Sequence, residues 1–318
     1  MNESTLDSKD LINEEPGKKS LFDGYKPSTT VLGFLAASII VFVWSGWIVV
    51  SKAGAVSAMT IYDIAALRFG VASIVALPIV LYYRPWKGMP LYRMLVLGSL
   101  AGVPYVLLSY AGFTYAPAAH GGVFLNGLLP AFTLLISWLW LSERPGYLQV
   151  IGSTVIVAGA WLVASSNNKL ELSESWTGDM LFMLAGAVFS VYMLLNRRWN
   201  VSVLQVLLCT SLLNGLIYLP IWALLLPSNL AEAQMSHILL QGAYQGLLPT
   251  MVGLIMLSYA VRHIGAPATA AMMSAVPCLG AILGLLFLNE NLGLNGWLGI
   301  LLLTPGIIVI AICRKPVK

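Results

Sequence analysis

Apolar residues form ten long stretches along the chain, separated by short polar or charged segments. A helix needs about 20 mostly apolar residues to cross ~30 Å of hydrocarbon, and each stretch is close to that length. We therefore predict an all-α integral membrane protein with ten transmembrane helices. The predicted spans are residues 32–51, 61–83, 91–115, 117–141, 147–164, 178–196, 203–226, 238–261, 267–288 and 296–313.

The composition agrees with this pattern, because 58% of the 318 residues are hydrophobic and only 9% are charged. Soluble domains carry roughly a quarter of their residues as charged side chains, so a soluble fold is excluded. Residues 1–31 mix acidic and basic side chains with Pro16, Gly17 and Pro27, without the basic start and early apolar core of a signal peptide. We expect a disordered cytoplasmic tail there.

Positive charges in the short loops predict the orientation. With the N-terminus inside, 14 of the 17 Lys and Arg residues fall on the cytoplasmic side, and only Lys52 and Lys169 fall outside. Both termini should therefore be cytoplasmic. The basic residues form no stripe interleaved with aromatics, so we expect no nucleic-acid partner. The three cysteines lack disulfide or metal-ligand spacing, and we expect no metal and no cofactor.

Landmarks in the first half of the chain recur in the second half. Four pairs lie 147 positions apart, namely Pro130 with Pro277, Glu143 with Glu290, Gly152 with Gly299, and Gly159 with Gly306. Each half holds five spans, an odd number, so the second copy enters the membrane from the opposite side. We predict two inverted five-helix repeats, residues 32–164 and 178–313, around a central cavity, an architecture typical of secondary transporters.

Several short motifs support a family resemblance. They are Trp44-Ser45-Gly46, Leu67-Arg68-Phe69 and Ser142-Glu143-Arg144-Pro145, the last echoed by Asn289-Glu290-Asn291. From residue 32 to 313 the chain resembles the EamA-type branch of the drug/metabolite transporter superfamily. The resemblance implies a cavity lined by the third, fourth, eighth and ninth helices with parts of the first and sixth. It also implies transport of amino acids or related metabolites. The second copy departs from the motifs, because Asn291 and Leu292 replace Arg144 and Pro145, and span seven has no counterpart of Arg68.

Five residues are candidates for the solute site because they lie toward the middle or the polar face of helices that the resemblance assigns to the cavity. They are Trp44, Tyr105, Asn126, Tyr192 and Gln245. Together they would offer aromatic surface and neutral donors and acceptors. Packing between helices is the alternative for each of them, since polar side chains within spans also bond neighbouring helices.

Other residues are interpreted as structural or gating. Arg68 lies within a span and needs a partner such as Glu290, with substrate contact or snorkelling as alternatives. Glu143 and Glu290 end equivalent helices and could cap a neighbouring helix or form a gate. Pro130 and Pro277 interrupt equivalent helices and leave carbonyl groups without an amide donor. His120 is expected to pack at the outer interface.

Enzyme chemistry is not expected. Tyr62-Asp63 and Gly178-Asp179 resemble the paired motifs of intramembrane aspartyl proteases, but Trp176 stands where the second motif needs glycine. Metalloprotease and serine-hydrolase motifs are missing from the sequence.

No Asp or Glu lies deep in a span, which argues against a buried carboxylate that exchanges protons for cationic drugs. We predict alternating-access transport of a small neutral or zwitterionic, amino-acid-like solute across a bacterial cytoplasmic membrane. The partners would be that solute and the lipid bilayer. The alternatives are a multidrug or other metabolite permease, a membrane protein without a transport function, and an intramembrane enzyme. The pattern leaves open the identity of the solute, the direction of transport, proton coupling and the oligomeric state.

Overall fold

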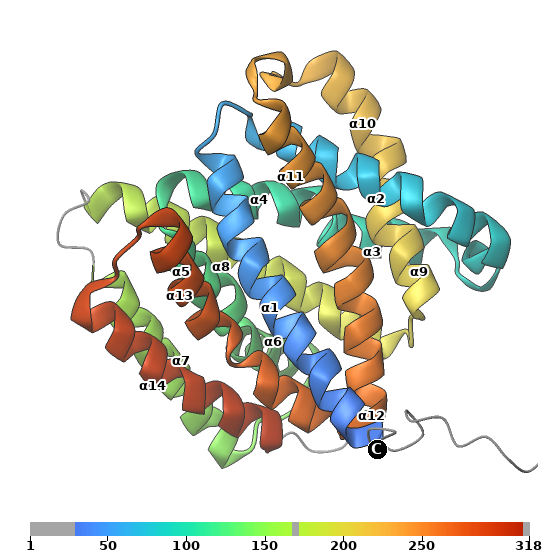
Figure 1. Cartoon of the computed structure of the whole chain (residues 1–318). Helices are drawn as coiled ribbons and strands as arrows, with labels where there is room; N and C mark the ends of the chain where they lie inside the picture. Colours follow the sequence, from blue (N-terminus) through green and yellow to red (C-terminus); the bar gives the residue numbers. More distant parts are fainter. Residues whose placement is uncertain (1–28, 167–171, 314–318) are drawn as a thin grey trace, which may run out of the picture.

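The computed structural model describes residues 29–166 and 172–313, and within them every regular element is a helix (Figure 1). Most of the predicted N-terminal tail, residues 1–28, lies outside the described residues. The N-terminal end of α1 and the C-terminal end of α14 lie at the same end of the helix bundle. This is expected of an even number of spans, because each span takes the chain to the opposite end of the bundle.

The first repeat contains five spans, three of them continuous and two built from consecutive helical pieces. Its elements are α1 (Thr29–Ala55), α2 (Ile61–Tyr83), the short η1 (Pro85–Gly88), α3 (Leu91–Ala101) with α4 (Val103–Tyr115), α5 (Ala118–His120) with η2 (Gly121–Gly127) and α6 (Leu129–Leu141), and α7 (Tyr147–Ala164).

The second repeat also has five spans, but its second span is built from consecutive pieces where the first repeat has the continuous α2. Its elements are α8 (Leu172–Arg198), α9 (Val203–Leu207) with η3 (Leu208–Leu213) and α10 (Asn214–Leu225), the short η4 (Leu230–Glu232), α11 (Met235–Leu247) with η5 (Leu248–Val252) and α12 (Gly253–Met273), α13 (Val276–Leu288), and α14 (Gly293–Ile312).

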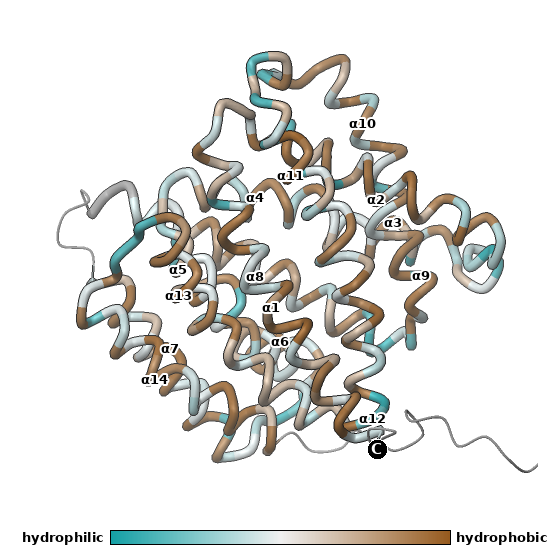
Figure 2. The backbone as a smooth tube through the Cα atoms, viewed as in Figure 1, coloured by the Kyte–Doolittle hydropathy of each residue, from teal (hydrophilic) through white to brown (hydrophobic). Residues whose placement is uncertain are grey.

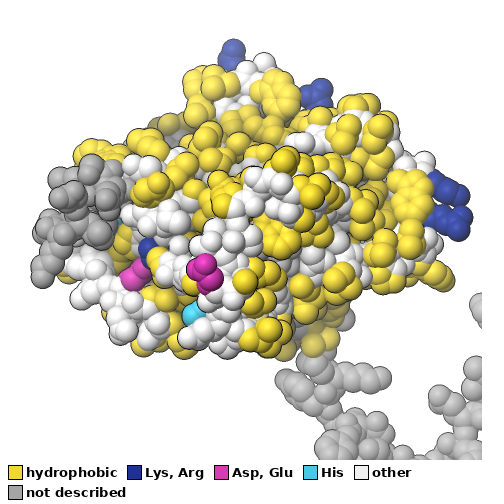
Figure 3. Space-filling model, turned by 90° about the horizontal axis from the view of Figure 1, so that it is seen from above, with side chains coloured by type: hydrophobic (Ala, Val, Ile, Leu, Met, Phe, Trp, Pro, Cys, Tyr) yellow, Lys and Arg dark blue, Asp and Glu magenta, His cyan; other side chains and the backbone are white. Residues whose placement is uncertain are grey.

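The helices have the length and surface of membrane spans. Nine helical segments in the described residues are long and apolar enough to cross a bilayer, and the shorter apolar α13 adds another. Hydrophobic residues cover the helices while hydrophilic residues gather at their ends (Figure 2). The view from above shows a mostly hydrophobic surface with few, scattered charged side chains (Figure 3). Large side chains such as Phe42, Leu139 and Leu224 are exposed, as expected of helices that face lipid.

The boundary between the eighth and ninth spans differs from the prediction. Residues 267–288 do not form one helix, because α12 runs to Met273 and α13 begins only at Val276. The chain reverses at Gly265, whose φ of 81° is readily adopted only by glycine, just before Pro267. The first repeat turns at the equivalent place, where Ala116 is extended before Pro117.

The last helices of the two repeats, α7 and α14, pack against each other through the glycines that recur in sequence. A Cβ atom on Gly159 would lie 2.6 Å from the carbonyl oxygen of Gly299, and one on Gly152 would lie 2.9 Å from that of Gly306. Only glycine allows the two backbones this separation. The offset in sequence pairs Gly152 with Gly299 and Gly159 with Gly306, whereas in space Gly152 lies next to Gly306 and Gly159 next to Gly299.

The conserved spacing of Pro130 and Pro277 also has a structural counterpart. Pro130 is the second residue of α6 and Pro277 the second residue of α13, so each proline starts a helix after a break. The hydroxyl of Ser45 donates to the carbonyl of Val276 at 3.2 Å, and the hydroxyl of Ser190 donates to that of Leu129 at 3.5 Å. A serine of each repeat thus donates a hydrogen bond to the broken span of the other repeat.

The third span is broken at Gly102, between α3 and α4. Asn214 compensates this break, since its Oδ1 accepts from the backbone N–H of Val103 and its Nδ2 donates to the carbonyl of Gly98 at 3.0 Å. Unpaired backbone groups are costly inside a bilayer, and this side chain satisfies them from the second repeat. The break lies beside the cavity described next.

Candidate solute-binding cavity

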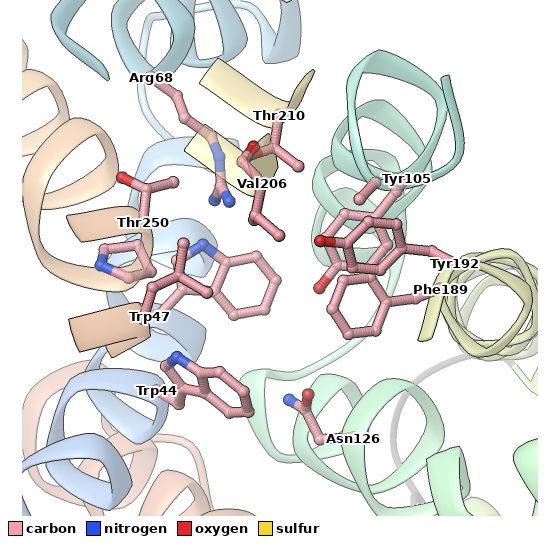
Figure 4. Close-up of a pocket in the computed structure, with 13 residues that line it drawn as sticks. Trp44, Trp47, Arg68, Tyr105, Asn126, Phe189, Tyr192, Val206, Thr210 and Thr250 are labelled. Atoms are coloured by element: carbon pink, nitrogen blue, oxygen red, sulfur yellow. The ribbon is translucent and has the colours of Figure 1, made fainter. Parts of the chain in front are cut away.

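A cavity of about 110 Å³ is enclosed by side chains of both repeats (Figure 4). Its lining residues come from both halves of the chain: Trp44, Trp47, Arg68, Ala101, Tyr105, Asn126, Phe189, Tyr192, Val206, Thr210, Pro249, Thr250 and Leu254. The volume has room for several water molecules, and hence for a small solute.

Aromatic rings form one wall of the cavity. The rings of Tyr105 and Phe189 stack with centroids 4.8 Å apart, and Phe189 lies 5.3 Å from Tyr192. Tyr105 comes from α4 of the first repeat, whereas Phe189 and Tyr192 lie one turn apart on α8 of the second. Trp44 and Trp47 of α1 lie across the cavity from these rings. The apolar part of a solute would therefore lie between ring surfaces contributed by both repeats.

Arg68 is the charged residue that lines the cavity, and Figure 4 shows its guanidinium group directed toward the space between Trp47 and the ring wall. Within the described residues no carboxylate lies within ion-pair distance of Arg68. Its Nη1 instead donates to Oε1 of Gln245 at a long 3.5 Å. The predicted partner Glu290 lies elsewhere, so this part of the expectation was wrong.

Gln245 lies behind Arg68 in a buried hydrogen-bonded network. Its Oε1 also accepts from the Tyr110 hydroxyl at 3.0 Å, and its Nε2 lies 3.1 Å from both Ser51 Oγ and Gln241 Oε1. Gln241 in turn donates to the carbonyl of Val50 at 2.7 Å. Every polar atom of the Gln245 side chain is thus already paired within the protein.

Two further polar groups at the cavity have no hydrogen-bond partner among the described residues. They are Nδ2 of Asn126 and Nε1 of Trp47, both of them donors. Buried donors are normally satisfied, and both of these nitrogen atoms lie beneath the surface of the lining without facing the open cavity.

The structure brings four of the five predicted site residues, Trp44, Tyr105, Asn126 and Tyr192, to one cavity. Gln245 does not line it and contacts it only through Arg68. The roles of all five in binding remain predictions.

The residues that the sequence did not single out are mainly Phe189, Val206, Thr210 and Thr250. Phe189 could have been found, because it lies one helical turn before Tyr192. Spans two and seven also contribute to the lining, beyond the helices implied by the family resemblance, whereas span nine does not.

The ends of the bundle show a difference between the equivalent residues Glu290 and Glu143. The Oε2 atom of Glu290 accepts a hydrogen bond of 2.7 Å from the backbone N–H of Ala118, at the start of α5. Glu143 instead pairs with Arg197 at 2.8 and 3.0 Å, and the side chains of Glu143 and Arg197 are 48% and 31% exposed. One end is closed by a partly buried contact and the other carries a solvated ion pair.

Two more polar residues lie near Glu290. His120 is completely buried, and its Nδ1 lies 2.7 Å from Oδ1 of the buried Asp179. Lys52 donates to the carbonyl of Phe113 at 2.8 Å. Asp63 caps α2 through reciprocal bonds with Thr60 and accepts from Nε1 of Trp222, which gives it a structural role at the start of that helix.

The chemistry of the cavity is that of noncovalent binding. Among the described residues, no cluster of His, Cys, Asp or Glu has the arrangement of a metal site. A chain of ten apolar helices in two inverted repeats, with a cavity between the repeats, is a membrane transporter.

The chain belongs to the EamA-like transporter family, whose pattern it matches twice, over residues 31–165 and 176–312. This confirms the family resemblance and the fold class of ten helices in inverted repeats. The chain is therefore a multi-pass protein of a lipid bilayer that carries a small-molecule substrate.

Similar proteins are transporters, not enzymes. The uncharacterised transporter YwfM of Bacillus subtilis (strain 168) is 24% identical over 75% of this chain and 78% of its own length. A probable terminal-alkyne amino-acid exporter of Streptantibioticus cattleyicolor is 26% identical over 72% of this chain and 77% of its own length. A solved crystal structure superposes with a TM-score of 0.61 at 20% identity, covering 90% of this chain and 96% of the other, which shows the shared fold.

Proposed function

We propose that this protein moves a small neutral or zwitterionic, amino-acid-like solute across a bacterial cytoplasmic membrane, with both termini cytoplasmic. The observation that carries the proposal is a cavity to which both repeats contribute aromatic side chains and the first repeat contributes the amide of Asn126. A site between inverted repeats can be opened to either face of the membrane when the two repeats move relative to each other. The repeats 32–164 and 178–313 would be the moving halves.

The difference between the two ends of the bundle supports alternating access. Glu290 and Glu143 are related by the repeat, yet only Glu290 holds the backbone of a neighbouring span. A transporter built from equivalent halves is expected to be closed at one end while the other is open, so equivalent residues differ in any one state.

The amino-acid-like substrate is supported by the similar exporter from Streptantibioticus cattleyicolor and by the character of the lining. Phosphorylated solutes would bring two negative charges to a cavity with one guanidinium group, and uncompensated charge is expensive to desolvate. Cationic drugs would find no carboxylate among the described lining residues, which argues against the multidrug alternative.

Flux into proteoliposomes from a panel of labelled metabolites tests the proposal. We expect amino-acid-like solutes to move faster than sugar phosphates. Alanine at Trp44, Tyr105, Asn126 or Tyr192 should lower that flux while the protein yield stays normal. Gln245→Ala should act more indirectly, through Arg68. Leu224→Ala is the control, because Leu224 is 81% exposed on the surface that faces lipid.

Unchanged flux in all four cavity variants would refute this site. Preferred transport of phosphorylated compounds or of cationic drugs would refute the substrate class.

A further inference from the structure

The positive charge of Arg68 is not compensated by any described neighbour. The two ion pairs in the described chain join His120 to Asp179 and Glu143 to Arg197. Among the described residues the Arg68 guanidinium reaches neutral groups, the amide of Gln245 at 3.5 Å and the hydroxyl of Tyr110. A guanidinium has five N–H groups in a planar fork, so most of them remain available on the side that faces the cavity.

The other unsatisfied polar groups at this cavity are donors as well. Nδ2 of Asn126 has no described partner, and neither has Nε1 of Trp47, a residue that is only 5% exposed. These two donors are buried beneath the lining, so the donor that faces a ligand is the guanidinium of Arg68, and a ligand that pairs with it must supply acceptors. A carboxylate accepts only, is planar, and can bind a guanidinium through two parallel hydrogen bonds.

The rest of the lining specifies the remainder of the ligand. The stacked rings of Tyr105, Phe189 and Tyr192 form an apolar wall opposite Trp44 and Trp47. No described lining residue carries a negative charge that could pair with an ammonium group. An amino group on the ligand could meet only ring faces, which attract cations weakly compared with a carboxylate.

We infer that Arg68 binds the carboxylate of the solute, and that the protein therefore recognises organic monocarboxylates with an apolar or aromatic body, with or without an amino group. This inference rests on the proposed function, in that it takes the cavity as the solute site. It changes the proposed class by making the carboxylate necessary and the ammonium dispensable, so that monoanions are included beside zwitterions. It also assigns Arg68, which the sequence suggested to be structural, to the recognition of the ligand.

Equilibrium binding to the purified full-length protein tests the inference separately from transport. Four related probes differ only in their charged groups: L-phenylalanine, 3-phenylpropionate, L-phenylalaninamide and 2-phenylethylamine. By isothermal titration calorimetry, we expect the first two to bind with dissociation constants within about threefold of each other. The amide and the amine lack the carboxylate and should bind at least about tenfold more weakly, as expected for the loss of a charge-assisted hydrogen bond.

Two substitutions test whether Arg68 is the group responsible. Arg68→Gln removes the charge, and Gln245→Glu places a carboxylate beside Arg68 and occupies it while keeping the shape of the side chain. In both variants the preference for acid over amide should fall to within about twofold. If Arg68→Gln yields no folded protein, Gln245→Glu decides alone. Gln149→Glu is the matched control, because Gln149 only accepts from Gly146 at the start of α7, outside the cavity.

Equal binding of L-phenylalanine and its amide to the unsubstituted protein would overturn the inference, as would binding of none of the four probes. A preference for the acid that persists in Gln245→Glu would also overturn it by placing the recognising group elsewhere. Carboxylate-dependent binding without flux in proteoliposomes would support Arg68 as the binding group and reject the proposed transport.

Discussion

The carboxylate of Glu290 accepts a hydrogen bond from the backbone N–H of Ala118, which lies 172 positions earlier in the other repeat. Ala118 begins the span that ends near Glu143, the repeat-related counterpart of Glu290. Glu143 forms no such bond in the described structure and pairs with the exposed Arg197 instead. The two ends of the molecule are therefore held by different kinds of contact, although the residues are equivalent.

Glu290→Ala should loosen the end of the bundle near α5. The substitution leaves the N–H of Ala118 without an acceptor, at a cost of about 1–3 kcal/mol, or a factor of five or more in an opening equilibrium. Opening can be measured as the rate at which a thiol reagent labels Ala119→Cys, a position that is 2% exposed, in a protein lacking the native cysteines. Glu290→Gln keeps an acceptor and should label slowly. Glu143→Ala is the control at the other end, and equal acceleration by it would contradict the expected role of Glu290.

The same end should respond to pH. Glu290 lies in the connection between α13 and α14, where burial raises the pKa of its carboxyl, while the Ala118 N–H, Lys52 and His120 oppose the rise. His120 is itself paired with Asp179. Because its pKa is raised, Glu290 in the closed arrangement binds a proton more tightly than a carboxyl in water. Lowering the pH from above the raised pKa toward the ordinary value of 4.5 therefore favours closure, and raising it weakens closure.

We expect the labelling of Ala119→Cys to increase with pH relative to the same cysteine in the Glu290→Gln variant. Taking the ratio of the two rates removes the pH dependence of the thiol itself. A ratio that stays constant across the titration, or rises on acidification, would show that Glu290 does not couple protonation to closure.

Glu143 and Glu290 should face opposite sides of the membrane, with Glu143 on the cytoplasmic side. The expectation rests on the 14 basic residues assigned to one side against two on the other. Single cysteines at the exposed neighbours Ser142 and Asn289 should therefore react differently with an impermeant thiol reagent in intact cells. Asn289→Cys should be labelled and Ser142→Cys protected until the membrane is permeabilised. Labelling from the same side would refute the inverted topology.

Gly159→Ala should destabilise the contact between α7 and α14. The added methyl group would lie 2.6 Å from the backbone oxygen of Gly299, and a backbone cannot move aside as a flexible side chain can. We expect a loss of about 1–3 kcal/mol, typical of overpacking, measured by thermal unfolding in detergent. Gly70→Ala is the matched control, since its nearest contact would be the side chain of Leu219 at 3.8 Å. An equal effect of the two substitutions would argue against the glycine contact.

Much of the fold could be predicted because a bilayer imposes simple rules on a sequence. The length of the apolar stretches marked the spans, and the common offset of 147 between Pro130 and Pro277 and between Glu143 and Glu290 marked the repeat. The exception was the ninth span, whose break after Met273 leaves the residues on both sides equally apolar. Hydropathy does not distinguish a broken helix from a continuous one.

The sequence by itself determined the membrane class, the helix number, the inverted repeat and most of the aromatic residues that line the cavity. The tertiary structure decided which polar side chains face that cavity. Gln245 and Arg68 are both polar residues within apolar spans, but Gln245 is satisfied by Tyr110, Ser51 and Gln241, whereas Arg68 has no charged partner among the described residues and a long bond to Gln245. Gln241 lies one turn away on the same helix, α11, but Ser51 of α1 and Tyr110 of α4 are more than 130 positions away along the chain. The rotation and packing of the helices decide such contacts, and a linear pattern of polar and apolar residues does not encode them.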